Sequence, residues 1–204
     1  MIISIRVLDI KALLLILNMK PAHFMKTDLT GILRVDSSRA IADIAIDAIE
    51  ENPGLFEKAW EIMILDEYPI SMRAARVVDE CGEKNPDLME PFLDEMIRRL
   101  PHFRVNGVKR GMLRYLSRTK LKPTPLLRGY LTETCFDWLS SVSEAIAIRF
   151  YSMEILFEIS RKEPAIRYEL MQLIEEGIER DTFGSASRPG KIIKILNKEL
   201  NLPQ

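Results

Sequence analysis

The stretch that decides the fold is MRAARVVDECGEKNPDLMEPFLDEMIRRL, residues 72–100. Its apolar residues recur every three or four positions on both sides of Pro86, which is helical spacing, and the strict alternation of a half-buried strand is missing. Proline cannot continue the helix before it, but it fits the first turn of the next helix, where its missing N–H needs no partner. The stretch therefore predicts a helix, a short turn and a second helix.

The same pattern returns along the chain at near-equal intervals. KNPDLMEPFL at Pro86 is matched by ENPGLFEKAW at Pro53, KPTPLLRGYL at Pro125 and KEPAIRYELM at Pro164, at intervals of 33, 39 and 39 residues. An arginine precedes each proline by 13 to 15 residues: Arg39, Arg73, Arg110 and Arg149. One helix pair cannot bury its apolar face alone, so successive pairs must stack.

We therefore predict an all-α fold, an α-α superhelix of about four stacked helix pairs. The expected pairs cover residues 37–67, 69–100, 105–141 and 142–180. A basic helix from about Pro189 to Leu200 is expected to cap the C-terminal end of the array.

At this level the chain resembles HEAT and armadillo-type repeats, chiefly in residues 72–100 and in VKRGMLRYLSR, residues 108–118. The resemblance covers most of residues 37–180. It implies a protein-binding scaffold of the solenoid class, and it assigns no chemistry, because such folds serve many unrelated partners.

The N-terminal residues form a separate part of the predicted domain organisation. Residues 1–36 hold the apolar segment MIISIRVLDIKALLLILN and a capping helix, and residues 37–204 hold the repeat domain. Arg6, Asp9 and Lys11 interrupt the apolar run, and no small-residue cleavage site follows it, so we do not interpret it as a signal peptide. An over-extended start, with Met25 as the alternative first residue, or a loosely docked helix fits better. We expect a cytoplasmic protein with no membrane partner.

Composition narrows the chemistry that the chain can carry. It has 47% hydrophobic residues, two cysteines and two histidines in 204 residues. Cys81 and Cys135 each lie within a helical apolar pattern with no second ligand at metal spacing, so we expect buried reduced thiols. We expect no metal site, no cofactor and no catalytic group, since zinc sites and histidine-based triads need clustered ligands.

Charge segregation is the strongest feature that the fold does not require. Residues 43–95 hold 15 acidic and 4 basic residues, whereas residues 96–132 hold 10 basic residues and no acidic one. On the helix expected from Asn106, Arg110, Arg114 and Arg118 recur every fourth residue, opposite an apolar face. We predict a solvent-facing basic stripe that binds an anionic partner and consists of Arg104, Lys109, Arg110, Arg114 and Arg118.

Two kinds of partner fit such a stripe, because clustered arginines bind carboxylates and phosphates alike. A protein partner is expected, and nucleic acid is the alternative. The alternative that the stripe faces the acidic neighbouring repeats stays open. The formal net charge of -1 and the acidic repeats weigh against a long nucleic-acid track.

Two enzyme families enter through resemblance. HEAT-like alkylpurine DNA glycosylases use an aromatic-lined basic groove and an acidic residue, which Asp137 and Trp138 would supply. Trp138 falls in the apolar helical set, however, so we expect it in the core. The loop at residues 184–191, GSASRPGK, is similar to a fragment of the fumarase and adenylosuccinate lyase signature, but 204 residues are too few for that family's long helical bundle.

Overall fold

The computed structural model describes residues 28–119, 122–180, 183 and 187–200. These residues form ten α-helices and four short 3₁₀ helices, and none of them lies in a strand. The α-helices are α3 (Leu29–Val35), α4 (Arg39–Glu51), α5 (Leu55–Ile64), α6 (Ile70–Lys84), α7 (Leu93–Arg99), α8 (Asn106–Arg118), α9 (Pro125–Ser140), α10 (Ile146–Ser160), α11 (Arg167–Glu179) and α12 (Arg188–Glu199). The 3₁₀ helices are η1 (Pro86–Leu88), η2 (Glu90–Phe92), η3 (Leu100–His102) and η4 (Pro164–Ile166).

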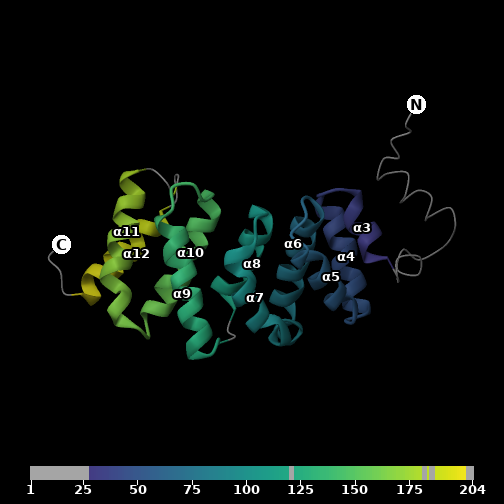
Figure 1. Ribbon diagram of the computed structural model, residues 1–204, viewed down its shortest axis with the longest axis horizontal. Helices are drawn as coiled ribbons and strands as arrows, with labels where there is room; N and C mark the ends of the chain where they lie inside the picture. The colour runs from purple at the N-terminus through teal and green to yellow at the C-terminus, as the bar shows by residue number, and fades with distance from the viewer. Residues whose placement is uncertain (1–27, 120–121, 181–182, 184–186, 201–204) are drawn as a thin grey trace.

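The helices stack in sequence order along an elongated body (Figure 1). The first helices of the four predicted units, α4, α6, α8 and α10, pack side by side in one layer. In the second layer, α7 packs on α9 and α9 on α11, while α3 covers the α4 end and α12 packs on α11. This arrangement confirms the predicted all-α superhelix, and α12 lies where the C-terminal capping helix was expected.

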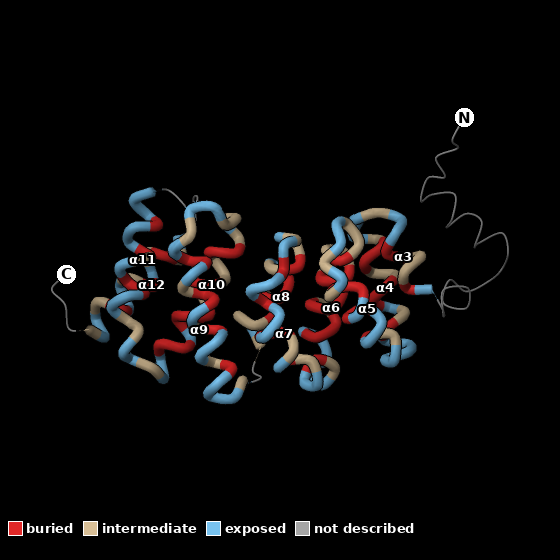
Figure 2. Tube along the Cα trace, in the orientation of Figure 1, coloured by how far each residue is buried: buried red, intermediate tan, exposed pale blue. Residues whose placement is uncertain are grey.

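A continuous core runs between the two layers, where the buried residues follow one another from α3 to α12 (Figure 2). Leu29, Ile32 and Leu33 of α3 belong to this same core. The helical spacing of the sequence also predicts seven particular core side chains, of which five are buried and two are partly buried. The buried ones are Trp60, Leu93, Leu139, Ile155 and Leu170, and the partly buried ones are Leu88 and Leu116.

Three of the four prolines begin helical turns as predicted, whereas Pro53 lies in a turn two residues before α5. Pro125 occupies the first turn of α9, where the Thr124 hydroxyl caps the helix by accepting from the Leu127 N–H. Pro86 and Pro164 instead open the 3₁₀ helices η1 and η4, and the α-helices start later. Proline supplies a fixed φ and lacks an N–H, and both properties suit a 3₁₀ turn as well as an α-helical one.

The strongest helix–helix packing joins different predicted units. α5 packs more extensively on α6 than on α4, and α9 packs closely on α10. Two small residues allow a similarly close approach of α6 and α8: a side-chain carbon added at Gly111 would lie 3.2 Å from both the Cβ and the carbonyl oxygen of Ala75. Consecutive units are thus held together over long helical contacts.

The recurring arginine has a structural use in two units. Arg73 donates through Nη1 to the carbonyl oxygen of Leu33, at 2.8 Å, and through Nε to the Ser37 hydroxyl, at 2.9 Å. Arg149 donates through Nε to the carbonyl oxygen of Leu139, at 3.3 Å, and burial lowers the pKa of its guanidinium. Both carbonyls lie near the C-terminal end of a preceding helix, where acceptors lack helical partners and cations are favoured.

Candidate partner-binding surface

Two arginines of the predicted basic stripe turn to the preceding repeat. The Arg114 guanidinium is paired with Oδ2 of Asp79 on α6, and Arg118 Nη2 lies 3.1 Å from Asp79 Oδ1. Arg118 Nη1 lies 2.8 Å from Glu83 Oε1. The Asp79 side chain is only 1% exposed, so these contacts satisfy a carboxylate that has left water.

Burial raises the pKa of the Asp79 carboxyl, and the guanidiniums of Arg114 and Arg118 oppose that rise. The expectation of a solvent-facing stripe is therefore wrong for Arg114, whose side chain is 33% exposed and lies against an acidic neighbour. The same neighbour takes up the charge of Arg118. The structure therefore supports the alternative in which Arg114 and Arg118 face the acidic neighbouring repeat.

Lys109 is also directed to a neighbouring repeat. Its Nζ lies 2.7 Å from Glu144 Oε1, just before α10, and 5.0 Å from the centroid of the Trp138 ring. The Lys109 side chain is 11% exposed. It was expected to add to an exposed patch, and the structure corrects this, because the ammonium group lies between a carboxylate and an aromatic ring.

Arg104 and Arg110 differ from these three residues. Both are exposed, and neither forms an ion pair with any of the described residues. The backbone N–H groups of Arg104 and Val105 donate to the carboxylate of Asp66, at 2.6 and 2.9 Å, which fixes the start of α8. Arg110 borders a cavity of about 170 Å³ that Arg73 and Arg76 of α6 also line.

Several ion pairs between neighbouring units share a spacing close to the repeat length. The carboxylate and the cation stand 34 or 35 residues apart in Glu50–Lys84, Asp79–Arg114, Glu83–Arg118, Lys109–Glu144 and Glu154–Arg188. We call this series the inter-repeat ladder. An acidic residue 34 or 35 positions earlier is a signal that the sequence contains, and it separates Arg114 and Arg118, which have one, from Arg110 and Arg104, which have none. Glu144 lies 34 positions after Arg110, but it is paired with Lys109.

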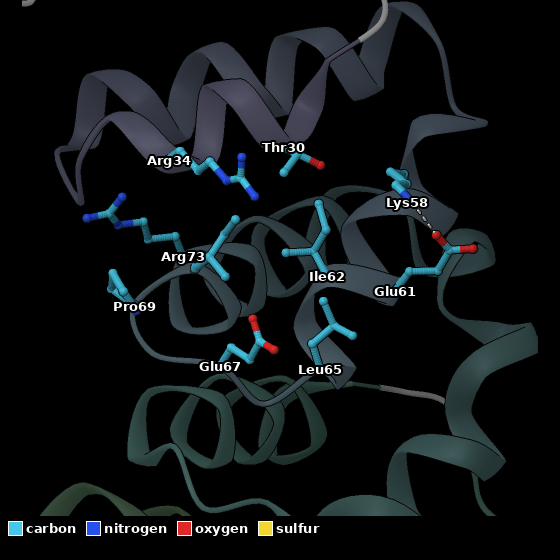
Figure 3. A pocket seen from close by; sticks show the side chains of 10 residues that line it. Thr30, Arg34, Lys58, Glu61, Ile62, Leu65, Glu67, Pro69 and Arg73 are labelled. Carbon is cyan, nitrogen blue, oxygen red and sulfur yellow. Dashed lines mark hydrogen bonds and ion pairs between the residues drawn. The ribbon is translucent and has the colours of Figure 1, made fainter.

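A larger cavity of about 480 Å³ lies at the N-terminal end of the solenoid, between α3, α5 and the turn into α6 (Figure 3). Ile62, Leu65 and Ile70 give it an apolar part. Arg34 of α3 and Arg73 of α6 lie on one side, and the Lys58–Glu61 ion pair, at 2.7 Å, lies on another (Figure 3). The sequence interpretation did not single out this cavity, because its walls come from three helices.

The residues that suggested enzymes are placed as follows. Trp138 is 8% exposed and belongs to the core, as expected, so its ring offers no free face for stacking a base. In the lyase-like loop, Gly184 and Ser185 lie outside the described residues. Pro189 is buried on α12, and Arg188 donates to both carboxylate oxygens of Glu154, at 2.7 and 3.0 Å.

Both thiols, Cys81 and Cys135, are free and buried, as predicted, and burial raises the pKa of each to about 12. No group of His, Cys, Asp and Glu side chains among the residues described could hold a metal ion. Within the same residues, no helix is long and apolar enough to cross a membrane.

Comparison with known proteins gives one match. No curated protein and no solved structure matches the chain. The sequence profile of the HEAT repeat domain matches residues 27–191, which include α3 to α11 and the start of α12. With four stacked units, a proline register and a ladder at the repeat spacing already evident, the chain belongs to the HEAT repeat domain family.

Proposed function

We propose that the chain is a non-catalytic helical-repeat scaffold that binds another protein on the first-layer side of the solenoid. HEAT repeats form elongated surfaces on which partners are bound over several units. The first-layer helices α4, α6 and α8 present arginines from three consecutive units, so a partner lying across them would contact more than one repeat. A cytoplasmic location and the boundary at residues 36 and 37 stay predictions.

The observation that carries the proposal is the pair of arginines outside the inter-repeat ladder. Arg104 and Arg110 are exposed and form no ion pair among the described residues, so their guanidiniums keep their capacity to bind carboxylates bidentately. Lys109, Arg114 and Arg118 complete the proposed anionic-partner surface, but their charges are already shared with neighbouring carboxylates. We therefore assign the binding energy mainly to Arg104 and Arg110.

Nucleic acid is the second candidate, favoured by the ten basic residues between positions 96 and 132. A nucleic-acid track needs cations that are free to replace counterions. Three of the five stripe residues are paired with carboxylates, which leaves an acidic protein surface as the better partner.

The test compares two anionic probes on the same protein. Binding of fluorescently labelled polyglutamate and of a DNA duplex should be measured for the wild type, for Arg104→Glu/Arg110→Glu and for Lys194→Glu/Lys198→Glu. The control pair makes the same charge change on exposed residues of α12. We expect polyglutamate binding to weaken at least tenfold in the first variant and less than twofold in the control.

Raising the salt concentration from 0.05 to 0.5 M should weaken wild-type binding as well, since exposed charges are screened within about 10 Å at 0.1 M. Tighter binding of DNA than of polyglutamate would favour the nucleic-acid alternative. Equal losses in the two variants would refute the assignment to Arg104 and Arg110.

A further inference from the structure

The smaller cavity adjoins the connection between α3 and α4, and it shares a lining residue with the larger one. Arg73 lines both, and its hydrogen bonds to the Leu33 carbonyl and the Ser37 hydroxyl fix that connection. Arg34 borders the larger cavity and Arg110 the smaller one. Three helices, α3, α6 and α8, thus place arginines around one continuous stretch of surface, which we call the arginine arc: Arg34, Arg73, Arg76 and Arg110.

The arginine arc is only partly neutralised by this protein's own carboxylates. Arg76 shares Glu80 with Arg39, with distances of 3.1 and 3.0 Å. Arg34 and Arg110, at opposite ends of the arc, are exposed and have no ion pair among the described residues. Arg34 and Arg110 therefore have no carboxylate partner in the described part of the chain, and the arginines between them stabilise the fold. The arc is complementary in charge to a peptide with several acidic residues.

Three carboxylates also lie close to the arginine arc: those of Glu61, Asp36 and Glu67. The Glu61 carboxylate is paired with Lys58. Asp36 accepts hydrogen bonds from Ser38, which hold the pKa of its carboxyl below the usual value, and its Oδ1 lies 2.7 Å from the Ser38 nitrogen. Glu67 extends into the larger cavity beside Leu65 (Figure 3), where its carboxylate can accept a backbone N–H from a bound peptide.

The larger cavity adds an apolar contact to the charged arc. Its volume of about 480 Å³ exceeds that of one large aliphatic side chain, and Ile62, Leu65 and Ile70 line it. Leu65 is 59% exposed, so covering its side chain removes apolar surface from water. A ligand for this site combines an apolar side chain with flanking negative charge.

We propose that the arginine arc and the larger cavity together bind an acidic peptide segment of a partner protein, with one apolar side chain in the cavity between α3 and α5. The carboxylates on either side of that residue contact Arg34 at one end and Arg110 at the other. This inference rests on the proposed scaffold function and moves its main contact toward the N-terminal repeats.

The probe is the peptide acetyl-Glu-Asp-Leu-Glu-Asp-amide with a fluorescein label, titrated with the full-length protein by fluorescence anisotropy. Arg34→Glu/Arg110→Glu should weaken binding at least tenfold. The matched control Lys194→Glu/Lys198→Glu carries the same charge change on exposed residues of α12, away from the arc, and should change binding less than twofold. Arg73 is kept in all variants, because it holds the α3–α4 connection.

The apolar contact is tested separately. Replacing the leucine of the peptide by serine should weaken binding to the wild type about fivefold, and Leu65→Glu should produce a similar loss with the original peptide. Thr30→Trp, which fills the cavity from α3 without a charge change, should do the same. Because Leu65 and Thr30 are not buried, these variants are expected to fold, and thermal melts followed by circular dichroism check this.

Three results would overturn the inference. Absence of saturable peptide binding at 1 mM protein is the first. Unchanged peptide binding in Arg34→Glu/Arg110→Glu is the second, and polyglutamate binding that Arg104→Glu/Arg110→Glu still weakens would then leave the scaffold function in place at another surface. The third is concentration-dependent dimerisation in sedimentation velocity that Arg34→Glu abolishes, because a second copy of the chain would then occupy the site.

Discussion

Arg110 and Arg114 stand one turn apart on α8, yet the structure uses them differently. Thirty-five residues before Arg114 lies Asp79, a buried carboxylate on the preceding first-layer helix, whereas the residue 35 positions before Arg110 is Ala75. Arg114 accordingly joins two repeats, and Arg110 remains exposed beside a cavity. In a repeat array, the role of a surface cation depends on the residue one repeat away as much as on its own helix.

The largest expected effect follows from removing both partners of Asp79. In Arg114→Ala/Arg118→Ala, the carboxylate that is 1% exposed would be left without a cation, and we expect the free energy of unfolding to fall by about 3–5 kcal/mol. Urea denaturation followed by circular dichroism measures this. Adding Asp79→Asn to the double variant should recover most of the loss, because the buried negative charge is then absent.

No recovery with Asp79→Asn would mean that the arginines stabilise the α6–α8 contact through packing of their aliphatic chains. A loss of stability below about 1 kcal/mol in the double variant would show that Arg114 does not stabilise the contact between α6 and α8.

A second prediction compares a glycine in the α6–α8 contact with a glycine on an exposed helix surface. Gly111→Val should lower the free energy of unfolding by about 1–3 kcal/mol, since the new side chain meets Ala75 across the two helices. Gly129 lies on the exposed side of α9 with open space around its Cα. Gly129→Ala should therefore raise stability by up to about 1 kcal/mol through helix propensity.

If both glycine variants shifted the urea midpoint in the same direction, the close approach of α6 and α8 would not be a determinant of stability. The different roles of Arg114 and Arg110 could then not be attributed to the close contact between α6 and α8.

A third prediction concerns alkaline pH and the burial of α6 and α9. Burial raises the pKa of Cys81 and of Cys135 from 9.0 to about 12. A raised folded-state pKa gives a stability contribution that is complete below pH 9 and is lost as the pH rises toward 12. At pH 10 we expect a loss of about 1.4 kcal/mol per thiol relative to pH 8. A Cys81→Ala/Cys135→Ala variant should lose correspondingly less stability over the same interval.

The sequence was sufficient for the architecture because the proline register and the apolar spacing are local. Both depend on residues within one unit, such as Pro125 and the Thr124 cap, and they placed the helix pairs and the C-terminal helix. The candidate site depended on contacts between units. The helical spacing of Arg110, Arg114 and Arg118 describes one helix only, so it did not show that Asp79 and Glu83 lie beside two of them.

The cavities were still less accessible to sequence interpretation. The larger one is formed by α3, α5 and the start of α6, and Arg34 was not part of any repeat pattern. In contrast, the ladder spacing of 34 or 35 residues is present in the sequence. A search for acidic and basic residues one repeat apart would have assigned Lys109, Arg114 and Arg118 to the interfaces between units, but it would also have selected Arg110, which lies 34 positions before Glu144.

The most direct test of the central claim compares Arg114→Glu with Arg110→Glu by urea denaturation in the same buffer. The two variants carry the same charge change one turn apart on α8. We expect Arg114→Glu to lower the free energy of unfolding by at least about 3 kcal/mol, because it places a second carboxylate beside buried Asp79, and Arg110→Glu to change it by less than about 0.5 kcal/mol. Equal destabilisation of the two variants would contradict the division of α8 into an inter-repeat contact and a free binding surface.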